Sequence, residues 1–147
     1  MSARVFFDTN VIVYAFDRLD AAKHLVAKRL LDEHVSDGSF SVSIQVLQEF
    51  YAVATRKLKN PAPPAKARAI VAELAQHRVV EPTSGMLLRG IDLSVRRQLS
   101  LWDALILEAA RDAGCSTVLT EDLAHGSSIE GLRITNPFRT GAATPQP

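Results

Sequence analysis

The stretch "RVFFDTNVIVYAF", residues 4–16, places a carboxylate between an apolar run and a helical pattern. Residues 5–7 are all apolar, which predicts that a strand at 4–8 is buried on both faces, as in a parallel sheet. Asp8 ends this strand, and a helix is expected to begin near Asn10. Because ligands of an open α/β sheet bind beyond the carboxyl ends of its strands, Asp8 occupies a position suited to function.

Short strands alternate with helical patterns along the rest of the chain. Apolar residues at positions 47, 50, 51, 54 and 58 recur at helical spacing, and Gly114 suits the end of a further helix. We therefore expect an α/β fold with a mainly parallel sheet of about five strands. The expected strands are 4–8, 40–43, 78–80, 117–120 and 132–135, and the expected helices cover 22–30, 47–58, the segment from the prolines to about 77, 84–99 and 102–113.

Length and composition favour one globular domain. The chain has 147 residues and a formal charge of +1, so it carries no general basic attraction to nucleic acid. Cys115 is the one cysteine and cannot form an internal disulfide. No apolar run approaches the roughly 20 residues that cross a bilayer, and the start shows no signal-peptide pattern. We expect a cytoplasmic protein without membrane contact, with a domain at 1–139 and a flexible tail at 140–147.

Two polar residues, Thr120 and Asp122, come at the end of the expected strand 117–120. Right-handed crossovers would place this strand beside 4–8, so that Asp8 and Asp122 share one rim of the sheet. Each acid also has a simpler interpretation. Asp8 could only cap the helix that follows it, and Asp122 could be a turn residue.

Asp103 and Glu49 lie on expected helices. Asp103 shares a helix face with Ile106 and Leu107, and a carboxylate on an apolar face needs a partner, a metal or a proton. The sequence "SLWD" also fits a capping box, in which Ser100 caps the helix and Asp103 is its third residue. Glu49 lies on a helix with apolar residues on both sides, although a surface glutamate is the more common case.

Four carboxylates at one rim would repel one another, and a cation would compensate their charge. Mg²⁺ or Mn²⁺ suits such a site, because hard divalent ions prefer oxygen ligands. Zinc is disfavoured, since the cysteine is isolated and the histidines show no paired ligand spacing.

These residues resemble the PIN domain, and specifically a VapC-type toxin ribonuclease of bacterial toxin–antitoxin pairs. The matching segments cover nearly the whole chain in order and are "FFDTNVIVYAF", "QEF", "WDALILEAARDAGCSTVLTEDL" and "GLRITNPF". The resemblance implies a three-layer α/β/α sandwich around a parallel sheet, with an acidic pocket that binds Mg²⁺ or Mn²⁺. Its acids would be Asp8, Glu49, Asp103 and Asp122, with Asn10 and Thr120 as polar supports. Glu121, next to Asp122, leaves the fourth acid open.

The resemblance implies metal-dependent hydrolysis of RNA phosphodiester bonds that leaves a 3′-hydroxyl and a 5′-phosphate. Asp8 and Asp103 would hold the cation, which lowers the pKa of a bound water and steadies charge on the phosphate. Glu49 and Asp122 would complete the shell or orient the attacking water, and Thr120 would fix a carboxylate rotamer. The resemblance also implies a homodimer and an antitoxin protein whose C-terminal segment covers the pocket.

Basic side chains that could grip RNA are scattered along the chain, and each is more often a solvated surface charge. The candidates are Arg56, Lys57, Lys59, Arg96 and Arg97. Two other functions compete with the ribonuclease: a non-catalytic PIN-like protein that binds RNA or a partner, and a receiver-type signalling module. A receiver has an acidic pair after its first strand and a lysine after its last, whereas "FFDTN" has one acid and "ITNPF" has no lysine.

Overall fold

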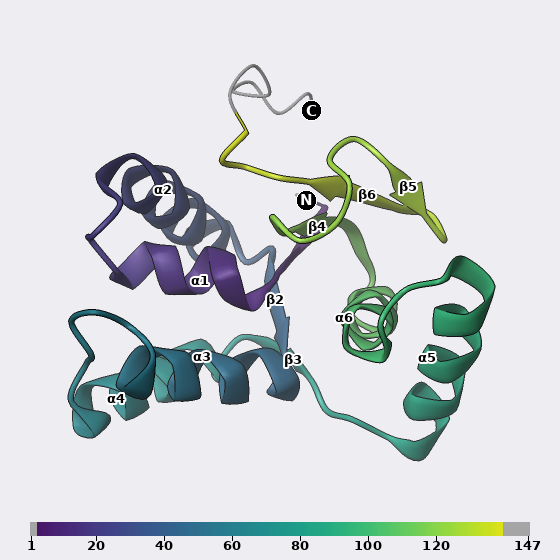
Figure 1. Cartoon of the computed structure of the whole chain (residues 1–147), viewed down its shortest axis with the longest axis horizontal. Helices are drawn as coiled ribbons and strands as arrows, with labels where there is room; N and C mark the ends of the chain where they lie inside the picture. The colour runs from purple at the N-terminus through teal and green to yellow at the C-terminus, as the bar shows by residue number, and fades with distance from the viewer. Residues whose placement is uncertain (1–2, 140–147) are drawn as a thin grey trace.

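Six strands form one sheet in the computed structural model, which describes residues 3–139. They are β1 Arg4–Phe7, β2 Phe40–Ser43, β3 Arg78–Val80, β4 Cys115–Leu119, β5 Ser128–Ile129 and β6 Leu132–Thr135. Their order is β3-β2-β1-β4-β6-β5, and every neighbouring pair is parallel except β5 and β6 (Figure 1). The expected α/β fold with a mainly parallel sheet is therefore confirmed.

The ends of the strands differ slightly from the sequence prediction. β1 stops at Phe7, because Asp8 already caps the following helix. β5 was not expected, since two residues are too short to show an alternating pattern. The predicted tail at 140–147 lies outside the described residues.

Helices cover both faces of the sheet. They are α1 Thr9–Phe16, α2 Ala21–Asp37, α3 Ile44–Arg56, α4 Pro64–Leu74, α5 Ser84–Arg97 and α6 Leu101–Asp112. Helices α1 and α2 lie on one side, and α6, backed by α5, lies on the other, while α3 packs between α1 and α4 (Figure 1). This arrangement confirms the three-layer sandwich. No helix among the residues that the structure describes is long and apolar enough to cross a membrane.

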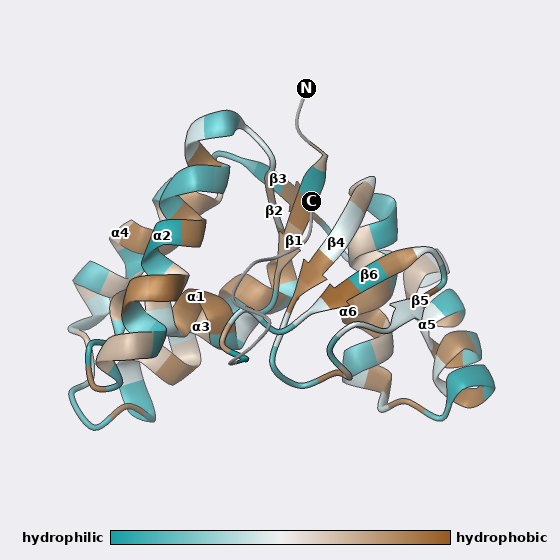
Figure 2. Cartoon of the chain, turned by 90° about the horizontal axis from the view of Figure 1, so that it is seen from above, coloured by the Kyte–Doolittle hydropathy of each residue, from teal (hydrophilic) through white to brown (hydrophobic). Residues whose placement is uncertain are grey.

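The apolar run that opens the chain forms the centre of the core. The ring of Phe7 lies 5.0 Å from that of Phe40 and 5.7 Å from that of His34, on the side covered by α2. Because side chains alternate along a strand, Phe6 faces the opposite layer. Both phenylalanines are fully buried, and Figure 2 shows the apolar residues along β1 and towards the ends of β4 and β6. This explains why the run does not alternate with polar residues.

The strand order reverses between β1 and β4, which lie side by side at the centre of the sheet. The backbone N–H of Asp8 donates to the carbonyl of Leu119 at 3.0 Å, so the two strand ends meet. This confirms the predicted neighbourhood of the two strands. It also excludes the receiver module, whose strand order is 2-1-3-4-5, and it marks the position at which open α/β sheets bind their ligands.

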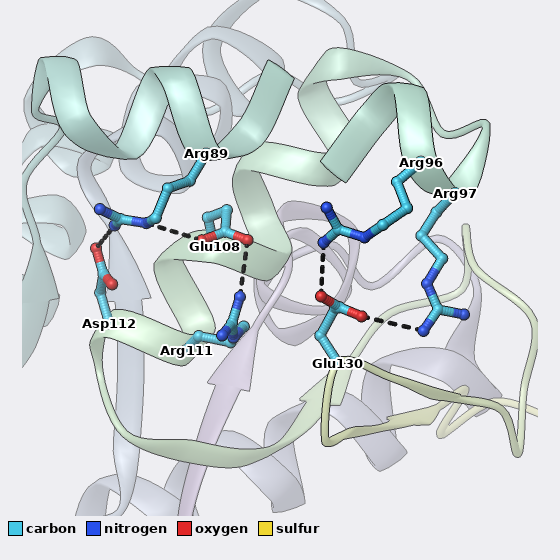
Figure 3. Close-up of polar contacts among 7 residues, drawn as sticks. All are labelled: Arg89, Arg96, Arg97, Glu108, Arg111, Asp112 and Glu130. Atoms are coloured by element: carbon cyan, nitrogen blue, oxygen red, sulfur yellow. Dashed lines mark hydrogen bonds and ion pairs between the residues drawn. The ribbon is translucent and has the colours of Figure 1, made fainter. Parts of the chain in front are cut away.

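A buried ion-pair cluster fixes α5 on α6 (Figure 3). Glu108 is only 2% exposed and accepts hydrogen bonds from Arg89 and Arg111, both at 3.1 Å. Arg89 also donates to Asp112 at 2.8 Å. Burial of a carboxylate is tolerated here because two guanidinium groups compensate it, and the cluster holds the layer that carries Asp103.

Candidate functional site

Asp8 is fixed at the switch point by hydrogen bonds to both of its carboxylate oxygens. Oδ1 accepts the backbone N–H of Thr9 at 2.7 Å, and Oδ2 accepts the hydroxyl of Thr120 at 2.7 Å. The side chain is 7% exposed. Asp8 therefore caps α1, as the simpler interpretation held, and it also lies at the predicted rim.

Asp122 lies on the other side of the same rim. Its Oδ2 accepts the side-chain amide of Asn10 at 3.0 Å, and its backbone N–H donates to the Thr120 hydroxyl at 3.1 Å. Glu121 instead pairs with Lys23 at 3.0 Å. The contact with Asn10 favours Asp122 as the fourth acid, because Glu121 already has a cationic partner.

Glu49 reaches the site from α3, although its side chain is exposed. Its Oε2 accepts the hydroxyl of Thr9 at 3.2 Å, and its Oε1 accepts the amide of Gln45 at 3.1 Å. These two contacts direct Glu49 towards the start of α1. Glu49 is thus a surface glutamate, as the simpler interpretation of the sequence held, and it also lies beside Asp8.

Asp103 stands in the first turn of α6. The backbone N–H of Asp103 donates to Oγ of Ser100 at 3.0 Å, which confirms the predicted N-cap. Its carboxylate does not line the cavity that the other three acids share. Its charge nevertheless helps to raise the pKa of Asp122, so the two carboxylates lie within electrostatic range.

A cavity of about 340 Å³ joins these side chains, and its wall includes Asp8, Asn10, Glu49 and Asp122. The pKa of Asp8 is raised to about 6, chiefly by burial and to a smaller extent by the charges of Asp122 and Glu49, while the hydrogen bonds from Thr120 and Thr9 oppose the shift. Burial also raises the pKa of Asp122, together with the charges of the neighbouring acids. The cavity is therefore a place where negative charge accumulates at a cost in free energy.

The sequence matches the profile of the PIN domain over residues 5–125, which is most of the chain. The chain belongs to the PIN domain family. PIN domains are typically nucleases and typically use divalent metals. No curated protein matches this chain.

Solved structures share the fold of this PIN domain at low sequence identity. The Mycobacterium tuberculosis toxin VapC20, described as cleaving the sarcin–ricin loop, is 22% identical with a TM-score of 0.64, covering 80% of this chain and 89% of that one. A toxin–antitoxin complex from Klebsiella pneumoniae is 18% identical with a TM-score of 0.65, covering 90% of this chain and 97% of that one. DNA-bound VapBC from Salmonella typhimurium is 18% identical with a TM-score of 0.61, covering 90% of this chain and 97% of that one. These likenesses show the fold alone.

The donor set of this PIN domain suits a hard divalent cation. The acids offer carboxylate oxygens, which Mg²⁺ and Mn²⁺ prefer. Within residues 3–139, no three His, Cys, Asp or Glu side chains approach closely enough to hold one ion together. Mg²⁺ usually keeps several waters and takes only one or two protein carboxylates, together with substrate phosphate. A site of this kind needs no preassembled group of three protein ligands.

The first group of predicted RNA-binding residues lies at the C-terminal end of α3. Arg56, Lys57 and Lys59 are all exposed. Leu58, between them, belongs to the wall of the acidic cavity. These cations therefore stand beside the proposed site without entering it, and their contact with RNA stays a prediction.

The second group lies at the end of α5. Arg96 and Arg97 both donate to Glu130, at 2.6 and 3.0 Å, and thereby attach α5 to the turn between β5 and β6 (Figure 3). Glu130 has a positive φ of 51°, which is uncommon for a residue other than glycine. The two arginines thus have a structural partner, and their contact with RNA also stays a prediction.

Several residues around the cavity were not singled out from the sequence. Thr9 links Asp8 to Glu49, and Lys23, Tyr14 and Phe138 cluster beside the cavity wall. The "DTN" motif contains Thr9, so its role could have been suspected. Lys23 gives no such signal, because its ion-pair partner, Glu121, lies 98 positions away in the sequence.

Proposed function

We propose that this PIN domain is a Mg²⁺- or Mn²⁺-dependent endoribonuclease, the toxin of a VapBC-type toxin–antitoxin pair. The observation that carries the proposal is the gathering of Asp8, Glu49 and Asp122 around one cavity at the switch point of the sheet. Membership of the PIN family supports nuclease chemistry. The likeness of fold to toxins of such pairs supports the biological assignment.

The side chains would divide the work of hydrolysis as follows. A divalent cation, when bound, supplies a water of lowered pKa and positive charge beside the scissile phosphate. Asp8 and Asp103 would hold it, while Asp122 and Glu49 would complete the shell or orient the attacking water. The hydrogen bond from Thr120 keeps Asp8 in one rotamer. In-line attack would break the bond from phosphorus to the 3′ oxygen, leaving a 3′-hydroxyl and a 5′-phosphate.

Alanine replacement of the acids tests the proposal. Asp8→Ala and Asp103→Ala should each lower Mg²⁺-dependent RNA cleavage more than about a hundredfold, since even supports of metal ligands are worth about ten- to a hundredfold. Both should also relieve growth arrest on expression. Asp92→Ala removes an exposed acid of α5 and should leave cleavage unchanged. A double variant, Asp8→Ala with Asp103→Ala, that cleaves as well as the wild type would refute the mechanism.

A non-catalytic PIN-like protein that binds RNA or a protein partner is the second candidate. The spacing of the carboxylates favours it, because they form no preassembled three-ligand group within the described chain. Titration with Mg²⁺ and Mn²⁺ separates the two functions. Cleavage that rises and saturates with metal supports the enzyme, whereas RNA binding without cleavage at any metal concentration supports the second candidate.

The proposal includes a cognate antitoxin and a homodimer. Two of the structural neighbours are a toxin–antitoxin complex and a DNA-bound VapBC. Leu88, Ile91 and Val95 of α5 are exposed apolar residues and are candidates for such contacts. Light scattering of the isolated chain should give twice the monomer mass. A short open reading frame upstream, encoding a DNA-binding protein that suppresses the cleavage, would identify the antitoxin.

A further inference from the structure

The acidic cavity poses an electrostatic problem for a polyanionic substrate. Its wall holds five carboxylates and, within the described chain, no lysine or arginine; the acids are Asp8, Asp17, Glu49, Glu121 and Asp122. A nucleic acid strand carries one negative charge per phosphate. Beyond the cation at the proposed catalytic centre, RNA binding therefore needs positive charge at the edge of this cavity.

Lys23 supplies a positive charge at this edge. Its Nζ donates to Oε2 of Glu121 at 3.0 Å and to the hydroxyl of Tyr14 at 3.4 Å, and both partners belong to the cavity wall. The backbone of Lys23 is fixed in the first turn of α2, where its N–H donates to the capping carboxylate of Asp20 at 3.1 Å. The ammonium group is thus held beside the acids.

Two aromatic rings complete the surroundings of this ammonium group. Nζ of Lys23 lies 4.8 Å from the ring centroid of Tyr14 and 5.4 Å from that of Phe138. The two rings meet edge to face at 5.0 Å. Cation–π contacts at these distances favour the charged form in this place. The cluster joins α1, α2, the segment after β4 and the segment after β6.

The cluster retains hydrogen-bond donors for a ligand. A lysine ammonium has three N–H donors, and contacts within residues 3–139 engage two of them. The Tyr14 hydroxyl accepts from Lys23, which leaves its own proton for an acceptor. The Lys23 side chain is 32% exposed, so solvent and a ligand can reach it. A phosphate oxygen matches both donors in charge and in chemistry.

We propose that Lys23 and Tyr14 bind a backbone phosphate of the RNA strand at the edge of the acidic cavity, next to the phosphate that is cleaved. The inference rests on the proposed ribonuclease function and adds a substrate-positioning site to it. Glu121 holds the ammonium group in place and lowers the positive potential that the strand meets.

A simple structural ion pair is the competing explanation for Lys23. Lys28 on the same helix provides the matched comparison, because its Nζ lies 3.1 Å from Oδ2 of Asp32 and both side chains are exposed. The double variants Lys23→Gln/Glu121→Gln and Lys28→Gln/Asp32→Asn each remove one positive and one negative charge. The parent and the two double variants then have the same net charge, so a difference in RNA binding depends only on where the ion pair lies.

The experiment measures the affinity of the full-length chain for a fluorescent single-stranded oligoribonucleotide by anisotropy, with Mg²⁺ present. All variants carry Asp8→Asn, which prevents cleavage during the measurement. Over about 50–200 mM NaCl, the slope of log K against log salt should become shallower by about 0.7 in Lys23→Gln/Glu121→Gln, the value for one contact with a single strand. The dissociation constant should rise about three- to tenfold, and the Lys28 pair should change neither quantity.

The single variants give opposite expectations for the two explanations. If Lys23 binds phosphate, Glu121→Gln should bind RNA more tightly than the parent, because it removes a negative charge and keeps the cation. If the pair is only structural, Glu121→Gln and Lys23→Gln should weaken binding alike, which would overturn the inference. Equal slopes for the double variant and the parent would also overturn it.

Failure of the inference can be told apart from failure of the proposed function. RNA cleavage by the otherwise wild-type chain, measured in parallel, tests the function by itself. If the wild-type active site cleaves RNA normally and the slope of log K against log salt is unchanged in the Lys23 variants, the proposed phosphate site is rejected and the proposed ribonuclease function stands. If the chain with the wild-type active site neither cleaves nor binds RNA, the proposed function and the phosphate site are both rejected.

Discussion

The hydroxyl of Thr120 donates a 2.7 Å hydrogen bond to Oδ2 of Asp8, which lies 112 positions away in the sequence. Both side chains are buried, and the same hydroxyl accepts the backbone N–H of Asp122 at 3.1 Å. One hydroxyl thus orients two of the four proposed acids. The geometry of the acidic cavity therefore depends on the contact between the ends of β1 and β4.

Thr120→Val should lower the rate of cleavage while keeping the volume of the side chain at position 120. Valine keeps the β-branched shape, but Asp8 loses a hydrogen bond that opposes the rise of its pKa. We expect kcat for Mg²⁺-dependent cleavage to fall about ten- to a hundredfold. The acidic limb of the pH–rate profile should also move to higher pH, because Asp8 then loses its proton at a higher pH.

Thr120→Ser is the matched control, since it keeps the hydroxyl and removes only a methyl group. Its pH–rate profile should coincide with that of the wild type. An unchanged profile in Thr120→Val would show that this hydrogen bond does not control Asp8.

Asn10→Ala should weaken metal binding. The side-chain amide of Asn10 donates to Oδ2 of Asp122 at 3.0 Å and opposes the rise of the Asp122 pKa. Without it, the carboxylate has more rotamers and holds its proton more strongly, so the apparent Mg²⁺ dissociation constant should rise about tenfold. Isothermal titration calorimetry measures this constant. Asn60→Ala, an exposed amide outside the acidic cavity, should leave it unchanged.

Much of the framework could be predicted from the sequence, because local patterns encode it. The apolar run before Asp8 indicates a strand covered on both faces, and the spacing of residues 47–58 indicates a helix. Right-handed crossovers then bring the ends of β1 and β4 together, which places Asp8 near Thr120 and Asp122. Short pairing such as that of β5 has too few residues to leave a pattern.

The partners of individual polar side chains could not be predicted, because they depend on packing between distant elements. The sequence leaves open which of Glu121 and Asp122 is the fourth acid, and it gives no sign that Glu121 pairs with Lys23 and Asp122 with Asn10. The sequence points to Asp103 as strongly as to Asp8, yet the carboxylate of Asp103 does not line the acidic cavity. The distance of α6 from the cavity depends on side-chain packing, which a helical repeat does not specify.

Variants of the buried cluster under α5 should separate stability from function. Arg89→Ala with Arg111→Ala leaves the Glu108 carboxylate buried without its two partners and should lower the free energy of unfolding by about 3–5 kcal/mol. Glu108→Leu replaces the charge with an apolar side chain of similar size and should change stability far less. Urea unfolding followed by circular dichroism measures both.

The control for this cluster is Lys28→Ala, which breaks an exposed pair and should cost less than about 1 kcal/mol. Equal losses in Arg89→Ala/Arg111→Ala and Lys28→Ala would contradict the assignment of Glu108 as a compensated buried charge. At a low temperature, where all three variants are still folded, their rates of RNA cleavage should be close to that of the wild type, because none of the replaced residues lines the acidic cavity.

Asp8 should make the metal-free protein less stable as the pH rises. Its pKa is raised from 3.8 to about 6 by burial, so between these values the folded chain keeps a proton that the unfolded chain has lost. This contribution to stability is fully present below about pH 4 and is lost as the pH passes about 6. Asp8→Asn cannot ionise, so in chelator at pH 7 it should exceed the wild type by about 1–3 kcal/mol in free energy of unfolding. The advantage should vanish near pH 4.

Adding Mg²⁺ at pH 7 should raise the melting temperature of the wild type and not that of Asp8→Asn, because the cation stabilises the ionised carboxylate. Parallel pH dependences for the two proteins in chelator would mean that Asp8 ionises in the folded chain as freely as it does in water.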